Sequence, residues 1–492
     1  MIFYLQRRHR LATNAAALAV FVFGCFVFGV FSVRRTTEGV LLVAALFCVV
    51  VYWVKPEGMV GVTLFGAFAA LPQGLHVGKV FGPVTIFAYQ LAAVLAICYL
   101  LPAVRMRRSD FLLPGMLTLM VVFSTVVGFE TGSDAKLVMR ESTTMLEMIV
   151  GFVLALFVVY GNYITWAIRV MAVTLWFSAG MAIVSSFHAI RLAGRAETLR
   201  GTGAGQALRI ILTTQTPATA VICALIAAAI IGRLRRATFF ALGVPALIIA
   251  FLAFTRNTLI AMAVSAGVAL IGGLSWSTLR RTVMVVAVAA AAVAVTVPGS
   301  LFLLHDTAAG GWLNDQLSVF NQRVLGGVSE SALAVDESTQ ERLREDALLN
   351  HEIARAPVFG HGLGYAYQPP KGEGDDEFNW TYYPAYSHNF YLWWLAKAGA
   401  VGMAAFVVFA LTPLFAALRR ASAPAKISAA ASAGLLAISA VWPLPEMPPD
   451  ALAVGLALGA AMAFAGLRRG VRDAGQPDAD RTPEPIGATT AG

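Results

Sequence analysis

The chain has 492 residues, of which 58% are hydrophobic and only 13% charged, and its mean hydropathy is +0.74. Soluble domains carry roughly 25% charged residues, so this chain lacks the polar side chains to cover a water-facing surface. A soluble enzyme, a secreted disulfide scaffold and a disordered regulator are excluded. The net charge of +9 does not indicate nucleic-acid binding, because the basic residues form short clusters between apolar runs, as in membrane proteins that fix their orientation by charge.

Apolar runs recur along the whole chain. A helix that crosses ~30 Å of hydrocarbon needs roughly 20 apolar residues, so we expect an all-α polytopic integral membrane protein with about 12–14 transmembrane helices. The expected spans are 13–31, 38–54, 58–76, 82–103, 110–129, 144–160, 163–187, 210–232, 238–254, 258–274, 282–304, 388–417, 428–442 and 450–467. The first follows Arg7, Arg8 and Arg10 and lacks a small-residue cleavage site, which is typical of a signal anchor.

These runs divide the chain into four regions. Residues 1–304 are expected to hold transmembrane helices 1–11, residues 305–387 a large loop with helices, and residues 388–470 helices 12–14. Residues 471–492 are rich in Pro, Asp, Thr and Gly and are expected to form a disordered cytoplasmic tail.

Basic clusters predict the orientation in the membrane. Six of them fall on one side of the fourteen-span arrangement, and the pair Arg34–Arg35 falls on the other. By the positive-inside rule the side of the six clusters is cytoplasmic, so both termini lie inside and residues 305–387 outside. The six are Arg7–Arg10, Arg105–Arg108, Arg233–Arg236, Arg280–Arg281, Arg419–Arg420 and Arg468–Arg469.

The loop 305–387 differs in character from the rest of the chain. It contains thirteen acidic residues against five basic ones, and loops of this length are usually functional. Ser338 and Glu341 have the spacing of a capping box, which predicts a helix that runs to about Ala356 and ends before Pro357. Arg342 would lie in its first turn, where a cation opposes the helix dipole.

Four cationic or titratable residues sit at the edges of apolar runs or inside one. Arg209 closes an arginine- and glycine-rich outside segment, and Arg256 lies in a minimal turn between two spans. Such an arginine either snorkels to the interface or forms the floor of an aqueous site. His388, where the loop re-enters the membrane, is either a satisfied interfacial histidine or a general base. Lys397 is a costly charge inside the next span, which an acidic residue or a lipid phosphate would have to neutralise.

Other motifs point to no cofactor and no metal. Residues 360–364 read Gly-His-Gly-Leu-Gly but lack the preceding strand and the third-glycine position of a dinucleotide fingerprint. Residues 351–355 lack the second histidine of a zinc protease motif, so we interpret them as helix surface. The acidic stretch 374–377 is interpreted as a solvated loop tip, and the four cysteines lie in apolar runs.

Read together, the loop motifs resemble the O-antigen ligase and polymerase superfamily of membrane proteins. The family pattern is an arginine that opens a periplasmic helix, a glycine-rich turn, then His-Asn and a helix that ends in Gly-x-x-Gly. Here these are Arg342, residues 357–364, His388–Asn389 and residues 399–402. The turn at Arg256 is similar to the family's Ser-Arg turn, with Thr255 in place of serine. The resemblance covers residues 337–405 and this turn, whereas the acidic insert 371–377 and the fourteen spans depart from the family.

The resemblance implies a type-C glycosyltransferase-like fold with a periplasmic loop over a lateral groove. It implies a metal-independent, inverting glycan ligase or exopolysaccharide polymerase of cell envelope biogenesis, which uses a polyprenyl-diphosphate-linked donor at the outer face of the bacterial inner (cytoplasmic) membrane. His388 would activate the acceptor hydroxyl, while Arg256 and Arg342, with Arg209 as a third, would hold the diphosphate through their planar forks. Further possible substrate contacts are Asn389, Gly360, Gly362, Gly364 and Lys397.

The expected partners are the lipid-linked glycan donor, a glycan or lipid-glycan acceptor, membrane lipids, a flippase and a chain-length regulator, but no nucleic acid. The motifs do not separate ligase from polymerase. Two alternatives are a transporter or flippase of the same donor and a non-catalytic envelope-assembly scaffold. A flippase should line its spans with charge through the bilayer, whereas the charges here gather at one face.

Overall fold

The computed structural model describes residues 36–72, 78–81, 84–187, 190, 192, 194–200, 206–273, 275–321, 324, 337–369 and 383–474. In these residues the fold is a bundle of helices, of which six are long and apolar enough to cross a membrane and seven more are apolar but shorter. The protein is therefore an all-α polytopic membrane protein, as its composition predicts. The expected first span, 13–31, and the pair Arg34–Arg35 lie outside the described residues.

The N-terminal part of the bundle contains most of the helices. They are α2 (Thr36–Val54), α3 (Gly58–Phe68), α4 (Ala88–Ala103), η2 (Arg108–Phe111), α5 (Leu112–Glu130), α6 (Ala135–Tyr160), α7 (Ile164–Phe187), α8 (Gln215–Ile231), α9 (Arg236–Thr238), η3 (Phe239–Gly243), α10 (Val244–Leu252), α11 (Asn257–Gly272) and α12 (Trp276–Leu304). After these come α13 (Ala308–Phe320), α15 (Glu337–Arg355), η6 (Tyr383–Ala385), α16 (Phe390–Leu418), α17 (Ala423–Ile438), η7 (Leu444–Glu446) and α18 (Pro448–Ala474).

Each predicted span from 38–54 onward coincides with one of these apolar helices, although some boundaries differ. Helix α6 begins at Ala135, nine residues before the predicted start at 144. Its N-terminus is capped by Asp134, whose Oδ1 accepts the backbone N–H of Lys136 at 2.8 Å. Its first turns carry Arg140 and Glu141, which hydropathy excluded from the span. The predicted span 58–76 is shorter, because α3 ends at Phe68.

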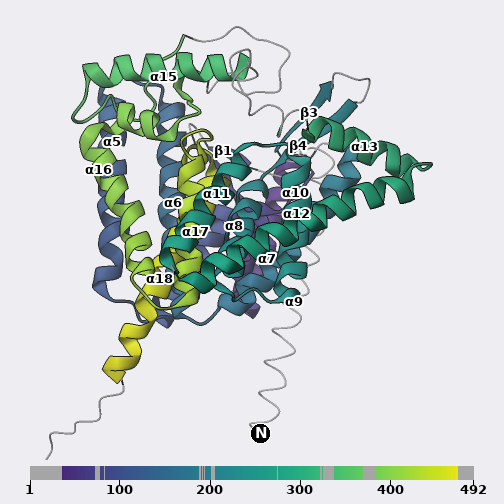
Figure 1. The fold of residues 1–492 in the computed structure, drawn as a ribbon. Helices are drawn as coiled ribbons and strands as arrows, with labels where there is room; N and C mark the ends of the chain where they lie inside the picture. Colours follow the sequence, from purple (N-terminus) through teal and green to yellow (C-terminus); the bar gives the residue numbers. More distant parts are fainter. Residues whose placement is uncertain are drawn as a thin grey trace, which may run out of the picture.

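Two antiparallel hairpins, which the apolar runs did not predict, interrupt the helices. Strand β1 (Gly78–Phe81) pairs with β2 (Val84–Phe87), and β3 (Gly194–Arg200) pairs with β4 (Gln206–Leu212). The second hairpin is the arginine- and glycine-rich segment, and its register places Glu197 opposite Arg209. Figure 1 shows β3 and β4 at the same end of the bundle as α15.

Helices α6 and α18 form the centre of the bundle. A Cβ on Gly455 or Gly459 of α18 would overlap the backbone of α6, and a Cβ on Gly151 of α6 would overlap the backbone of α18. Small residues allow this backbone-to-backbone approach inside a membrane. Phe152 of α6 also packs on Phe409 of α16, with ring centroids 4.9 Å apart. This rigid centre carries the elements that build the site.

Candidate functional site

Helix α15 lies across one end of the bundle, above α5 and the start of α16 (Figure 1). It ends at Arg355, before Pro357, which confirms the predicted stop. Its first residue is Glu337, so Arg342 lies in the second turn rather than the first. The sequence of α15 is mostly polar. The residues that it turns toward the bundle face the segment that precedes α16.

The closest contact between these two elements joins His388 to Glu345. Nδ1 of His388 lies 2.8 Å from Oε2 of Glu345, and the same oxygen accepts the backbone N–H of His388 at 3.1 Å. The Glu345 side chain is 2% exposed and the His388 side chain 27% exposed. A carboxylate on Nδ1 favours the tautomer in which that nitrogen carries the proton, which leaves Nε2 as an acceptor. The buried carboxylate therefore orients an accessible imidazole.

A second pair lies beside the first. The Asn389 side chain lies near Asp346 and lowers the pKa of its carboxyl group, and its Oδ1 accepts the backbone N–H of Leu392 at 3.4 Å, as the N-cap of α16. Burial raises the pKa of Asp346, and Glu345 adds to this, whereas Asn389, His388 and Arg342 oppose it. Asn389 thus links the start of α16 to α15.

Arg342 lies near these residues, because its positive charge lowers the pKa of Asp346 and of Tyr386. Its Nε is buried and has no hydrogen-bond partner among the described residues. Burial raises the pKa of Tyr386, while Arg342 and Arg140 lower it, which places both cations near this phenol. The Tyr386 ring in turn meets the His388 ring edge-on, with centroids 5.1 Å apart. Two arginines, from α15 and α6, therefore lie near the Tyr386 ring that contacts His388.

The other two predicted arginines meet elsewhere at this end. Arg209 of β4 donates through Nε to the carbonyl of Ala253 at 3.0 Å. Ala253 begins the turn between α10 and α11 that contains Arg256, and Phe254 in this turn has a positive φ of 46°. Thr255 Oγ1 accepts a hydrogen bond from Gln215 of α8 at 2.9 Å. The hairpin β3–β4 and α8 thus hold the turn, and Arg209 lies beside it.

The glycine turn 357–364 docks into a break in α16. At Gly399 (φ 64°, ψ −170°) α16 is not helical, and the next two backbone N–H groups donate to Pro357 O at 2.8 Å and Val358 O at 3.2 Å. Before the break, Ala396 O accepts from the N–H of His361 and Lys397 O from the N–H of Gly362, both at 2.9 Å. The turn therefore satisfies backbone groups that the broken helix leaves without partners, which a membrane environment demands.

Glycine is required in this turn for two reasons. Gly360, Gly362 and Gly364 have positive φ values of 70°, 86° and 78°, which other residues rarely adopt. A Cβ would overlap the backbone at Lys397 for Gly360, the backbone of Gly128 for Gly362, and Val138 for Gly364. The turn is thus wedged between α5, α6 and α16, and these three glycines make structural contacts.

Lys397 has an acidic partner, one of the two alternatives that its sequence position left open. Its Nζ lies 2.9 and 3.1 Å from the two carboxylate oxygens of Glu141 in α6 and donates to Tyr365 O at 2.6 Å. Glu141 Oε2 also accepts the N–H of Gly364 at 2.6 Å. Lys397 is fully buried. The pair therefore locks the glycine turn onto α6 and α16.

The interpretation of residues 351–355 as plain helix surface was wrong for Glu352. Its side chain is 12% exposed and accepts from the hydroxyl of Tyr365 at 2.7 Å and from Arg355 at 3.0 Å. Burial acts to raise the pKa of Glu352, but these hydrogen bonds and the charges of Arg355 and His361 outweigh it and lower the pKa. Glu352 thus fastens the end of α15 to the glycine turn.

Several residues of this region had no sequence signal. Glu345 and Asp346 look like ordinary charges of a polar helix, and Arg140 and Glu141 precede a predicted span. Glu446 follows Pro445 in a connection, yet it is buried and its Oε2 accepts the N–H of Ser387 at 3.4 Å. Burial raises the pKa of Glu446 well above its usual range. The one available hint in the sequence was that these carboxylates belong to a mostly apolar chain, in which a charged side chain is costly to bury and is often functional.

Comparison with known families agrees with the motifs. Residues 241–407 match a family model described as O-antigen ligase, a range that contains the turn of Arg256, helix α15, the glycine turn and His388. A comparison with curated proteins gave no match. The predicted family resemblance, based on residues 337–405 and the turn at Arg256, is confirmed. Residues 241–407 are thus similar to the O-antigen ligase family, and the chain is an O-antigen ligase-like membrane protein of glycan processing.

Proposed function

We propose that the protein transfers or polymerises a glycan from a polyprenyl-diphosphate carrier onto a sugar hydroxyl at the outer face of the inner membrane. The observation that carries this proposal is the pairing of the accessible His388 with the buried carboxylate of Glu345. Next to this pair, on the helix that carries Glu345, lies the buried Nε of Arg342, which has no hydrogen-bond partner in the part of the chain that the structure describes. An oriented base beside a cation suits a reaction in which a hydroxyl attacks and a phosphate group leaves.

In the proposed reaction the acceptor oxygen attacks the anomeric carbon of the donor and its proton passes to Nε2 of His388. The new bond is the glycosidic C–O bond. The bond that breaks joins the anomeric carbon to the diphosphate, which departs with the electron pair on the polyprenyl carrier. A single displacement of this kind inverts the anomeric centre. Glu345 stabilises the imidazolium that forms, as a carboxylate does in other histidine pairs.

Arginines are proposed to neutralise the leaving group without a metal. Negative charge on the diphosphate grows in the transition state, and preorganised cations stabilise it most strongly there. Arg342 is the first candidate because its Nε has no partner among the described residues. Arg256, Arg209 and Arg140 are further candidates at the same end of the bundle.

The polyprenyl chain needs an apolar surface within the bundle, and the pocket that offers one reaches toward the end of α6 that lies opposite α15. A pocket of about 270 Å³ opens between α3, α6, α7, α8, α17 and α18, and among the described residues that line it only Ser428 has a polar side chain. A hydrocarbon chain is the ligand that such a wall accepts at least cost. We propose this pocket for part of the carrier.

The test separates chemistry from donor binding. Purified His388→Ala should still bind polyprenyl-diphosphate glycan but transfer it about 10²–10⁴-fold more slowly, as expected for loss of a general base. Arg342→Ala should lose both donor affinity and rate, and Arg342→Lys should recover only part, because lysine lacks the bidentate fork. Donor binding in detergent and product laddering on a gel measure the two effects.

The matched controls are His351→Ala and Arg344→Ala. Both residues are exposed on α15, and both variants should behave as the wild type. Full transfer by His388→Ala would refute the catalytic assignment. Donor movement across vesicles, unaffected by His388→Ala and without any transfer product, would instead identify a flippase.

A further inference from the structure

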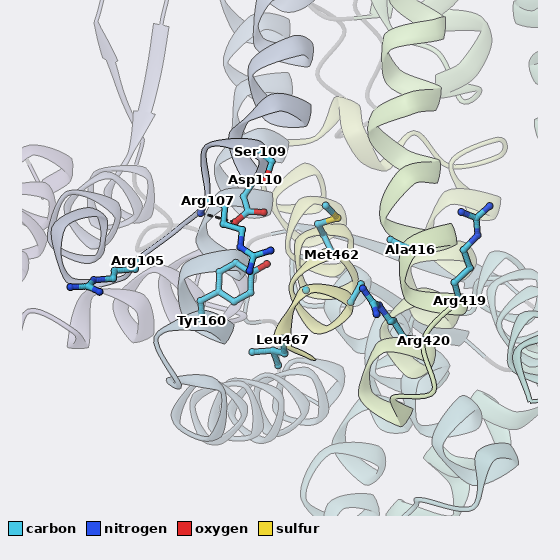
Figure 2. Close-up of a pocket in the computed structure, with 12 residues that line it drawn as sticks. Arg105, Arg107, Ser109, Asp110, Tyr160, Ala416, Arg419, Arg420, Met462 and Leu467 are labelled. Carbon is cyan, nitrogen blue, oxygen red and sulfur yellow. Dashed lines mark hydrogen bonds between the residues drawn. The ribbon is translucent and has the colours of Figure 1, made fainter. Parts of the chain in front are cut away.

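A second pocket, of about 690 Å³, lies at the end of the bundle opposite α15, where α16 and α6 end and α5 begins. Four segments build it: the connection between α4 and α5, the last residue of α6, the end of α16, and α18. Figure 2 shows its lining, which includes Arg105, Arg107, Asp110, Tyr160, Arg419 and Arg420. The lining holds four arginines and one carboxylate, so the pocket is strongly cationic.

Two of the arginines point toward the centre. Figure 2 shows the guanidinium of Arg107 next to the ring of Tyr160, and Arg420 extending from the opposite wall, whereas Arg105 and Arg419 lie at the outer edges. One carboxylate oxygen of Asp110, Oδ2, already accepts a hydrogen bond from the backbone N–H of Arg107 at 3.1 Å. The two central cations come from connections more than three hundred residues apart in the sequence.

Orientation by charge does not by itself produce such an arrangement. The positive-inside rule asks only that basic residues lie on the cytoplasmic side, and Arg235 and Arg280 satisfy it without lining this pocket. Convergence of Arg107 and Arg420 on one concavity is an additional feature, and it places several guanidinium donors where one anion can meet them.

The lining also specifies what kind of anion fits. Guanidinium groups match the oxygens of a phosphate. Between them lie the apolar side chains of Met462, Leu467 and Ala416, which a free phosphate would leave unused but the glycerol and acyl parts of a lipid would cover. Basic pockets between spanning helices on the cytoplasmic side bind phospholipid headgroups in other proteins. We propose that this pocket binds the phosphate of an anionic phospholipid, held by Arg107 and Arg420 with the Tyr160 hydroxyl as a further donor.

The experiment uses the whole chain in nanodiscs of phosphatidylcholine with increasing phosphatidylglycerol, and native mass spectrometry to count retained lipids. The wild type should retain phosphatidylglycerol saturably. Arg107→Gln and Arg420→Gln should each weaken retention by roughly tenfold, since each removes charge-assisted hydrogen bonds. The matched control is Arg108→Gln, an exposed neighbour that does not line the pocket and should retain the lipid as the wild type does.

Three outcomes would overturn the proposal: no saturable retention, an equal loss in Arg108→Gln, or displacement of the lipid by millimolar inorganic phosphate or pyrophosphate, which would identify a soluble ligand instead. Thermal unfolding of each variant in pure phosphatidylcholine shows whether it is folded. If a glutamine variant does not fold, the corresponding lysine variant, Arg107→Lys or Arg420→Lys, is measured in its place. The lysine keeps the charge, so it should lose only part of the lipid retention. None of these readouts depends on glycan transfer.

Discussion

A carboxylate on one nitrogen of a histidine ring decides which nitrogen remains to act on a substrate, and Glu345 stands in that relation to His388. The carboxylate is almost completely buried, and it accepts from both the ring and the backbone N–H of His388. Two hydrogen bonds to one oxygen fix the ring and the main chain together. Glu345 is therefore a positioning residue in the proposed reaction.

Glu345→Gln should keep the size of the side chain and remove its charge. The amide can donate to Nδ1 and so favour the wrong tautomer, and it cannot stabilise an imidazolium. We expect kcat to fall by at least about 10²-fold, as in other carboxylate–histidine pairs, with little change in donor affinity. Steady-state kinetics alongside donor binding measures this split.

Glu341→Gln, one turn earlier on α15, is the control. Its carboxylate pairs with the exposed Arg344 at 3.6 Å, and loss of such a surface pair should leave kcat unchanged. Equal losses in donor affinity and in kcat for Glu345→Gln would instead indicate that α15 as a whole had moved.

At the scale of elements, the glycine turn and the broken α16 depend on each other. The turn supplies acceptors and donors to the backbone on both sides of Gly399, and the break gives the turn room to enter between α5, α6 and α16. The segment that begins at Pro357 leads directly out of α15, so this docking also sets where α15 lies. The glycines of the motif thus act on His388 indirectly, through the position of the helix that carries Glu345.

Gly362→Ala should destabilise the protein more than Gly132→Ala. Both glycines have positive φ, 86° and 76°, so both variants incur the roughly 1–2 kcal/mol of left-handed strain. Only at Gly362 would the new Cβ also overlap the backbone of Gly128, whereas nothing lies within 4 Å of the one at Gly132. Thermal unfolding in detergent compares them, and equal losses would contradict a wedged turn.

Lys397→Met should leave Glu141 as a buried and unpaired charge. Removal of one partner of a buried ion pair costs roughly 3–5 kcal/mol, so we expect a clear fall in the unfolding temperature. Glu141→Gln in the same chain should restore much of the loss, because the glutamine oxygen still accepts the N–H of Gly364 without carrying a charge. A double variant no more stable than Lys397→Met would argue against this coupling.

Local signals in the sequence predicted some elements well. Pro357 predicted the end of α15, because a proline acts within a few residues of the boundary, whereas the predicted N-cap Ser338 lies inside the helix, which begins at Glu337. The partner of Lys397 could not be predicted in this way, since Glu141 is 256 residues distant in the chain. Glu345 was likewise invisible, because only the docked position of α15 distinguishes it from the other charges of a polar helix.

At the scale of the whole molecule, hydropathy predicted the bundle because length and apolarity decide whether a helix crosses a membrane. It failed where polar residues are buried by protein rather than exposed to lipid, as at the start of α6 with Glu141. It also missed the hairpin β3–β4, whose arginines and glycines follow no apolar alternation. The ends of helices and the connections, where the candidate site lies, are thus the parts that composition predicts least.

Which face of the bundle lies outside the cell is the prediction on which the proposed mechanism depends. α15 and the pocket of Arg107 and Arg420 lie at opposite ends of the bundle, and the described basic residues next to α9, Arg233–Arg236, lie at the pocket's end. By the positive-inside rule, α15 should therefore be extracytoplasmic, where a lipid-linked glycan that has already crossed the membrane meets its acceptor.

Cysteine labelling tests this orientation, in a background from which the four native cysteines have been removed. A cysteine in place of the exposed His351 on α15 should react with a membrane-impermeant maleimide in intact spheroplasts. One in place of the exposed Arg235, between α8 and α9, should react only after permeabilisation. The reverse pattern would place His388 and Glu345 in the cytoplasm and would end the proposal of transfer at the outer face, whereas the Lys397–Glu141 lock, which depends only on packing, would stand.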